Sequence, residues 1–148
     1  MKIEGKVINE MRLRLPSLSA NEGMARAAVA AFCAQLDPDV CALADIKCAV
    51  SEAVTNAIVH GYRDRVGDIY ITVWLYNDGS VRIEIRDRGC GIPDVRLARQ
   101  PLYTTDAASE RSGMGFTVME SFCDKVGVRS ACGKGTKVIL YKKLKKRE

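Results

Sequence analysis

Glu52-Ala-Val-Thr-Asn56 is the stretch that decides the fold, because two glycine signatures follow it in order along the chain. The first is Asp87-Arg-Gly-Cys-Gly91 and the second is Ser112-Gly-Met-Gly115, and a Gly135-Thr136 pair comes after both. Each piece alone is weak, since a Glu and an Asn four residues apart occur on many helices. The ordered set of four is hard to obtain by chance, and it predicts an ATP site without a P-loop.

Size and composition indicate one globular domain. The chain has 148 residues, of which 47% are hydrophobic and 28% are charged, which is enough for one sizeable core. The longest apolar run, residues 27–34, is too short to span a bilayer. The first residues lack the apolar segment of a signal peptide. We therefore expect a cytoplasmic protein that does not enter a membrane.

The cysteines do not indicate a metal site. They stand at positions 33, 41, 48, 90, 123 and 132, no two form a Cys-x-x-Cys pair, and the chain has a single histidine. Zinc is therefore disfavoured. In a cytosolic protein we expect reduced, partly buried thiols. Cys90, inside a glycine loop, is expected to be the most accessible.

The net charge of +5 comes mainly from the end of the chain. Residues 142–148 hold five of the 23 basic residues and one of the 18 acidic residues, so the remainder carries 18 basic and 17 acidic residues. A nearly neutral body disfavours direct nucleic-acid binding. We expect this basic tail to be a solvated, mobile end.

Hydrophobic periodicity predicts an α+β fold: a two-layer α/β sandwich whose mostly antiparallel mixed sheet has helices on one face. A Ser19…Glu22 capping box opens the first helix, and Asp37-Pro38 opens the second. The expected strands are residues 11–15, 69–76, 81–87, 126–130 and 136–141, and the expected helices are residues 19–36, 37–61 and 115–122, with a short one near 95–98. Residues 1–10 are a segment of unclear role, residues 11–141 form the domain, and 142–148 form the tail.

Glu52 and Asn56 lie one turn apart on the second helix, away from its apolar arc. That arc, which we expect to face the sheet, contains Leu43, Ile46, Val50, Ala53, Val54 and Ala57. An Asn oxygen can bind Mg²⁺, and a neighbouring Glu can accept a proton from a hydroxyl group or from water. The alternative is a solvated polar face without a ligand.

Asp87 ends a strand in which Val81, Ile83 and Ile85 share one face, so its carboxylate is expected to be covered as well. A buried carboxylate needs a partner, and the adenine amino group would serve as one. Thr136 alternates with inward residues and is expected in the same pocket. The alternative is an exposed Asp87 that caps the turn at Gly89.

Ser112-Gly-Met-Gly115 opens the third helix, and a glycine-rich entry leaves N–H groups free to bind an anion. Thr104, Thr105 and Arg111 stand just before it and could fold over phosphates, with Arg111 neutralising the terminal phosphate. The alternative is a plain loop-to-helix turn.

This set of motifs resembles the GHKL ATPase superfamily. The resemblance implies a Bergerat fold that holds ATP and Mg²⁺, with Glu52 as the catalytic Glu, Asn56 as the Mg²⁺ ligand and Asp87 as the adenine-binding Asp. The catalytic residues are then Glu52 and Arg111. The nucleotide-binding residues are Asn56, His60, Asp87, Gly89, Gly91, Thr104, Thr105, Ser112, Gly113, Met114, Gly115 and Thr136.

Segments 50–62, 98–105 and 110–116 are more closely similar to the anti-sigma serine kinases of spore-forming bacteria. The resemblance runs from about Met11 to Tyr141. It implies a homodimer that binds a sigma factor, through Arg26 and Glu22, and phosphorylates a serine of an anti-anti-sigma protein.

Three alternatives remain open. The first is a stress-response switch kinase of the same family, and the second is the ATP-binding domain of a histidine kinase. The third is a module that binds ATP only to shape a sigma-binding surface.

Overall fold

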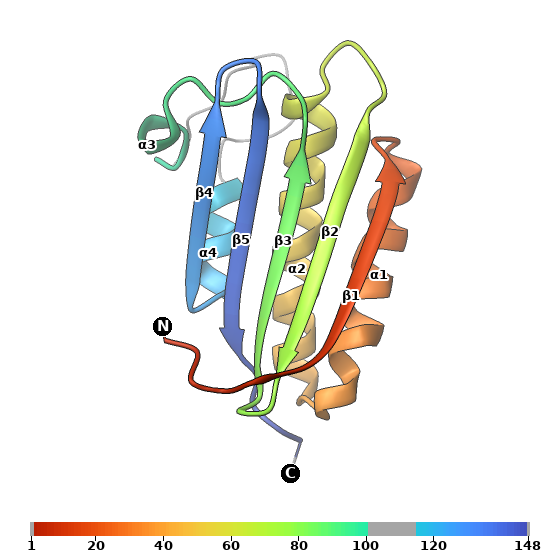
Figure 1. Ribbon diagram of the computed structural model, residues 1–148, viewed down its shortest axis with the longest axis vertical. Helices are drawn as coiled ribbons and strands as arrows, with labels where there is room; N and C mark the ends of the chain where they lie inside the picture. The colour runs from red at the N-terminus through yellow and green to blue at the C-terminus, as the bar shows by residue number, and fades with distance from the viewer. Residues whose placement is uncertain (1, 101–114, 148) are drawn as a thin grey trace.

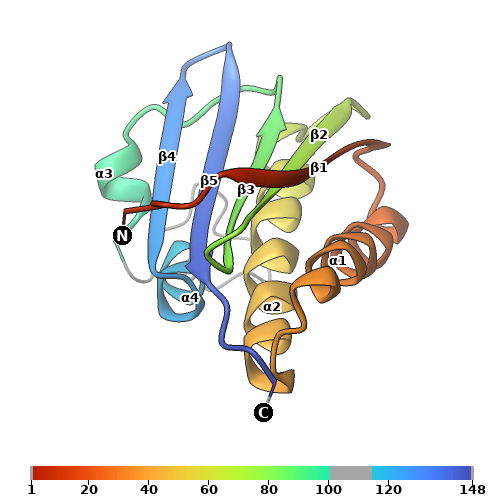
Figure 2. The same cartoon turned by 60° about the horizontal axis from the view of Figure 1, so that its bottom comes forward.

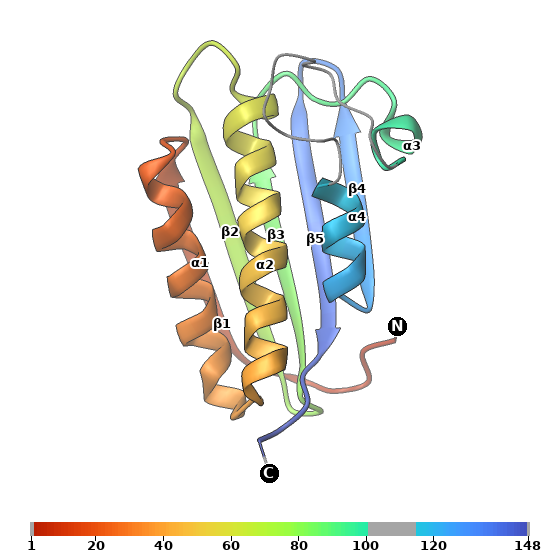
Figure 3. The ribbon, with the colours of Figure 1, turned by 180° about the vertical axis from the view of Figure 1, so that it is seen from behind.

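The computed structural model describes residues 2–100 and 115–147, which form a five-stranded sheet with helices on one face (Figures 1 and 3). The strands are β1 (Val7–Pro16), β2 (Asp68–Tyr76), β3 (Ser80–Asp87), β4 (Lys125–Ala131) and β5 (Gly135–Lys143). Their spatial order is β1-β2-β3-β5-β4, and each neighbouring pair is antiparallel. The predicted two-layer fold class is confirmed.

Three helices cover the inner face of the sheet, and Figure 2 shows them all on the same side. They are α1 (Ala20–Cys33), α2 (Val40–Asn56) and α4 (Gly115–Phe122). The short α3 (Val95–Ala98) lies beside β4, at the edge of the sheet (Figure 1). A 3₁₀ turn, η1 (Ala34–Leu36), follows α1, and a π turn, η2 (Ala57–Gly61), prolongs α2.

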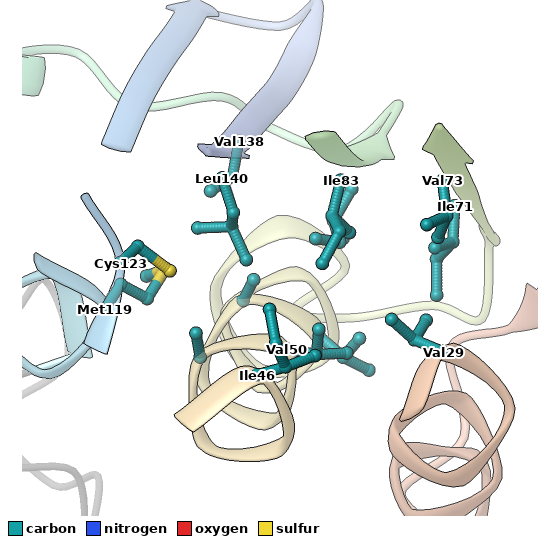
Figure 4. Packing of buried hydrophobic residues seen from close by; sticks show 14 of the residues in the cluster. Val29, Ile46, Val50, Ile71, Val73, Ile83, Met119, Cys123, Val138 and Leu140 are labelled. Carbon is teal, nitrogen blue, oxygen red and sulfur yellow. The ribbon is translucent and has the colours of Figure 1, made fainter. Parts of the chain in front are cut away.

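The core lies between the sheet and these helices (Figure 4). Alternate residues of β2 are buried, as a strand covered on one face requires. The largest fully buried side chains are Val29, Ile46, Val50, Val54, Ile69, Ile71, Val73, Leu75, Ile83, Ile85, Met119 and Leu140. Of the predicted apolar arc of α2, all but Leu43 are buried, and Leu43 packs against the core while partly exposed.

The first helix starts after Ser19 as predicted, but the capping of both predicted helix starts differs from the structure. Ser19 has a helical backbone, with φ −57° and ψ −30°, and makes no side-chain cap. The Glu22 carboxylate instead accepts a hydrogen bond from the Ser51 hydroxyl group of α2. The N-cap of α2 is Asp39, whose Oδ1 accepts from the Ala42 amide at 2.7 Å. Asp37 has a left-handed φ of 52° and terminates η1 instead, a conformation that an Asp side chain tolerates.

Both chain ends are more ordered than the sequence indicated. β1 begins at Val7 rather than at residue 11, since residues 7–10 pair with the end of β2 although their side chains stay exposed. The expectation of a solvated basic tail is wrong as far as Arg147. Leu144 is buried, the Asp39 amide donates to the Lys145 carbonyl at 2.7 Å, and the Arg147 amide donates to the Asp37 carbonyl at 2.9 Å. We call residues 144–147, held against residues 37–39, the C-terminal clip.

All six cysteines are free thiols. Burial raises the pKa of both Cys33 and Cys123 to about 12. Cys90 is exposed, as expected, and so are Cys41, Cys48 and Cys132. In the described part of the chain, no helix combines the length and the apolar character needed to cross a bilayer.

The outer face of the sheet carries half-buried aromatic rings stacked against arginines. The Arg86 guanidinium lies 4.9 Å from the Tyr70 ring centre, and that of Arg82 lies 5.0 Å from the Trp74 ring centre. Such stacking shields the rings from water without a second layer of helices. The predicted site residues Asp87 and Thr136 project from the other face and are buried.

Candidate functional site

Glu52, Asn56 and Gly115 meet where the end of α2 faces the start of α4. A Cβ atom at Gly115 would lie 3.3 Å from Asn56 Oδ1 and 3.4 Å from Glu52 Oε2. A larger side chain at position 115 would therefore press on both polar groups. The structure brings these three predicted residues together where α2 and α4 meet.

The π turn η2 carries the chain from α2 to Asp87. The Tyr62 amide donates to the Ala57 carbonyl at 3.0 Å, and the wider turn sets Gly61 against the end of β3. A Cβ atom at Gly61 would lie 2.8–2.9 Å from the carboxylate atoms of Asp87. The lack of a side chain at Gly61 therefore lets the Asp87 carboxylate pack directly against η2. From the sequence, Gly61 indicated only a helix end, so its role in the site was missed.

Asp87 is 6% exposed, as predicted from the strand alternation. Its Oδ1 accepts a hydrogen bond from the Gly89 amide at 2.9 Å. Asp87 therefore caps the turn at Gly89, as in the alternative interpretation, but it does so while buried. Burial raises the pKa of Asp87, and hydrogen bonds from the Gly89 and Thr136 backbones oppose that rise. A ligand that donates a hydrogen bond to this carboxylate would stabilise its charged form.

The loop after Asp87, which contains Gly89 and Gly91, packs closely against two neighbouring backbone segments. A Cβ atom at Gly89 would lie 2.0 Å from the Gly61 carbonyl oxygen, and one at Gly91 would lie 2.0 Å from the Ala131 carbonyl oxygen. Gly91 also has a positive φ of 76°. Only glycine fits at these two positions. Both predicted residues thus let the loop after Asp87 pack closely against the Gly61 and Ala131 backbone.

Thr136 lies in register with Asp87 on one side and with Ser130 on the other, across β3, β5 and β4. It is 9% exposed, and its Oγ1 lies 2.8 Å from Ser130 Oγ. Ser130 Oγ also accepts from the Ile92 amide at 2.7 Å. Ser130 was not singled out from the sequence, because its neighbours depend on strand pairing.

His60 lies in η2 with a half-buried side chain, and its carbonyl oxygen is 3.0 Å from Cys90 Sγ. The other predicted nucleotide residues, Thr104, Thr105, Arg111, Ser112, Gly113 and Met114, lie outside the described residues. The predicted partner residues stand on α1. Arg26 is exposed and lies 3.6 Å from Glu22, whose carboxylate is engaged by Ser51.

The residues present fit a nucleotide. Asp87 and Thr136 supply buried polar atoms at one end, where Gly61 lets η2 lie close to the Asp87 carboxylate. The start of α4, next to Asn56, suits anionic groups at the other end. Among residues 2–100 and 115–147, no three His, Cys, Asp or Glu side chains form a metal cluster.

Comparisons of the sequence agree with this geometry. Residues 15–142 match the histidine kinase-like ATPase domain family. A curated relative, the anti-sigma F factor of Geobacillus kaustophilus, is 53% identical over 138 residues, covering 93% of this chain and 94% of the relative. The anti-sigma F factor of Bacillus licheniformis is 53% identical over 139 residues, with 93% and 94% covered.

Solved structures share the fold. The RsbU and RsbW domains of a Mycobacterium tuberculosis protein align with a TM-score of 0.68 at 24% identity, covering 95% of this chain and 35% of that chain. Full-length ShkA in complex with AMPPNP aligns with a TM-score of 0.58 at 15% identity, covering 99% of this chain and 32% of that chain. At these identities the two structures support the architecture alone.

Proposed function

This chain belongs to the histidine kinase-like ATPase domain family and, within it, to the anti-sigma F factors, and from that premise we propose that it inhibits a sporulation sigma factor by binding it. We further propose that it is a cytoplasmic serine kinase that transfers phosphate from ATP to an anti-anti-sigma protein. The non-catalytic sigma-binding module remains the competing possibility, which the experiment below separates from the kinase.

The buried carboxylate of Asp87 is the observation that supports nucleotide binding best. It is 6% exposed, and only a glycine at position 61 lets η2 lie this close to both of its oxygens. An adenine amino group would donate to it, and Thr136 would face the same base. Gly89 and Gly91 would let the loop approach the nucleotide, and His60 would line the pocket.

Asn56 would supply an oxygen ligand to Mg²⁺ at the phosphate end, where the metal would neutralise phosphate charge. Gly115, at the start of α4, would present its backbone to the phosphates. From the segment outside the described residues, Arg111 would neutralise the terminal phosphate. Thr104, Thr105, Ser112, Gly113 and Met114 would contact the phosphate chain.

Glu52 would act as the general base. Its Oε2 lies on the side of α2 that faces the start of α4, close to the expected phosphate end. There it would take the proton from the acceptor serine as the serine oxygen bonds to the terminal phosphorus and ADP leaves.

Helix α1 would contact the sigma factor. Arg26 and Met24 are both exposed on it, and Met24 has 59% of its surface exposed. Glu22 would contribute mainly by orienting Arg26, since the two side chains lie 3.6 Å apart.

We also propose a homodimer, which sedimentation equilibrium would detect as twice the chain mass.

Glu52→Gln tests the kinase reaction. The exchange keeps size and polarity but removes the base, which is worth about 10²–10⁴ in rate. Phosphate transfer from labelled ATP to the anti-anti-sigma partner should collapse, while ADP binding and sigma capture persist. Glu10→Gln, on the exposed part of β1, is the matched control and should transfer at the wild-type rate.

Two results would contradict this assignment. Transfer by Glu52→Gln at the wild-type rate would exclude Glu52 as the base. A wild-type protein that captures the sigma factor with ATP, yet transfers no phosphate to the partner, would favour the non-catalytic module.

A further inference from the structure

We propose that Ser130 is a positioning residue of the nucleotide pocket, which sets the direction of the Thr136 hydroxyl proton and ties the glycine loop to β4. This inference rests on the proposed adenine-nucleotide site. It assigns a role to a residue outside the motifs that predicted the site.

The placement comes from strand pairing. Asp87, Thr136 and Ser130 form one row across β3, β5 and β4, because Thr136 is in register with both of the others. Directly paired residues project from the same face of a sheet. A carboxylate and two hydroxyl groups therefore line the inner face at one level, and the two hydroxyl oxygens are 2.8 Å apart.

The hydrogen-bond partners of Ser130 allow two arrangements of the hydroxyl protons of Ser130 and Thr136. A serine hydroxyl group has one proton and two lone pairs, and the Ile92 amide occupies one lone pair at 2.7 Å. The proton can go to the Gly135 carbonyl oxygen, at 3.0 Å, or to Thr136 Oγ1, at 2.8 Å. In the first arrangement Thr136 donates back to Ser130 and presents only lone pairs to the pocket. In the second, the proton of Thr136 is free to point into the pocket.

An adenine base selects the second arrangement. Its Watson–Crick edge presents an amino donor beside a ring nitrogen that accepts, so it needs an acceptor next to a donor. Asp87 is the acceptor, and Thr136 becomes the donor when Ser130 donates to it. Guanine presents a carbonyl oxygen and an N–H group in those positions, and its carbonyl would face the Asp87 carboxylate. Ser130 thereby adapts the pocket wall to adenine.

Ser130 also restrains the loop that carries Gly89 and Gly91. Its bond to the Ile92 amide holds the residue that directly follows the loop. One hydroxyl group therefore connects two walls of the pocket, the loop after β3 and the strand β5. Loss of this group should weaken binding through both connections.

A double-mutant cycle on ADP affinity, measured by calorimetric titration, tests the connection to Thr136. Ser130→Ala and Thr136→Val should each weaken ADP binding about five- to tenfold, as expected for the loss of one or two net hydrogen bonds. Because Ser130 acts partly through Thr136, the two losses of ADP affinity should not simply multiply. The double variant should bind ADP at least threefold more tightly than multiplication of the two single-variant losses predicts. Ser130→Thr, which keeps the hydroxyl group, should bind ADP with near wild-type affinity.

The control is Ser121→Ala, since Ser121 Oγ donates within α4 to the Thr117 carbonyl oxygen at 2.9 Å, and its ADP affinity should not change. Ser130→Cys, similar in size and a weak donor, replaces the alanine variant if that one fails to fold. It should also weaken ADP binding.

The outcomes separate this inference from the proposed function. ADP binding by the wild-type protein supports the nucleotide site, and its absence would overturn both. Multiplicative losses in the cycle, or a Ser130→Ala variant that melts at a lower temperature with unchanged ADP affinity, would overturn the role of Ser130 alone.

Discussion

At the scale of single residues, Asp87 is placed for binding at a cost to stability. We predict that Asp87→Asn weakens ADP and ATP binding equally, because both nucleotides carry the same base. The loss of a charge-assisted hydrogen bond is worth about 1.5–3 kcal/mol, or roughly ten- to a hundredfold in affinity. Calorimetric titration measures this. Wild-type affinity in the folded variant would remove Asp87 from the pocket.

The same substitution should stabilise the empty protein near pH 7. The pKa of Asp87 is raised in the folded state by burial, so folding disfavours its charged form at neutral pH. As pH falls through that raised pKa, the wild-type carboxyl group takes up a proton and the penalty disappears. The stability advantage of Asp87→Asn, measured by urea unfolding, should therefore shrink from pH 7 toward pH 4. An advantage that grew on acidification would contradict this.

A substitution of Gly61 should disturb the Asp87 carboxylate directly. An added methyl group in Gly61→Ala would lie within 2.8–2.9 Å of the carboxylate atoms, so either the carboxylate or the π turn must move. We predict at least a tenfold loss of ADP affinity, by analogy with a lost charge-assisted bond. Gly127→Ala serves as the control for a glycine substitution, since the nearest atoms lie 3.8–4.0 Å from its Cβ position and its φ is not positive. Wild-type affinity of Gly61→Ala would show that the carboxylate does not need this space.

Asp87 and Thr136 could be predicted from the sequence because each follows a period-two pattern that ends in the pocket. Gly61 and Ser130 could not. Gly61 acts through a π turn that looks like an ordinary helix end, and Ser130 acts through its neighbours on β5 and in the glycine loop. Such contacts depend on which strands pair, and local periodicity does not report strand order.

At the scale of elements, the helices and strands were predicted well in number and type. The start of α1 after Ser19 was right, but its capping box and the N-cap of α2 were wrong. A capping box satisfies local hydrogen bonds, yet Glu22 bonds to Ser51 across the packed α1–α2 pair instead. Tertiary contact thus overrode the local pattern. Helix α4, by contrast, ends at Phe122 as predicted, and Asp124 follows its apolar face.

Helix α1 can be tested apart from the nucleotide site. We predict that Arg26→Ala weakens sigma-factor capture at least tenfold while leaving ADP affinity unchanged, since truncating a central interface arginine commonly costs about 2 kcal/mol or more. Arg129→Ala, exposed on β4, is the matched control. Pull-down at graded sigma-factor concentrations measures the effect. Unchanged capture by Arg26→Ala would move the contact surface away from this helix.

At the scale of the whole molecule, the C-terminal clip ties the end of the chain to the start of α2. Leu144 is 6% exposed, so Leu144→Ala should lower the free energy of unfolding by about 2–4 kcal/mol. Lys145→Ala, exposed one residue later, should change it by less than about 0.5 kcal/mol. Chemical denaturation separates these values. Equal stability of the two variants would mean that the tail behaves as a solvated end.

The strand order β1-β2-β3-β5-β4 also has a consequence for how the molecule is made. The last strand to leave the ribosome, β5, is inserted between β3 and β4, and it brings Thr136 to Asp87. A nascent chain in which Glu52, Asn56 and Asp87 have already been synthesised still lacks a continuous sheet. Because domains fold as units, the newborn chain can complete the proposed nucleotide site only after β5 has been synthesised. Until then, the unpaired edges of β3 and β4 are open to chaperones.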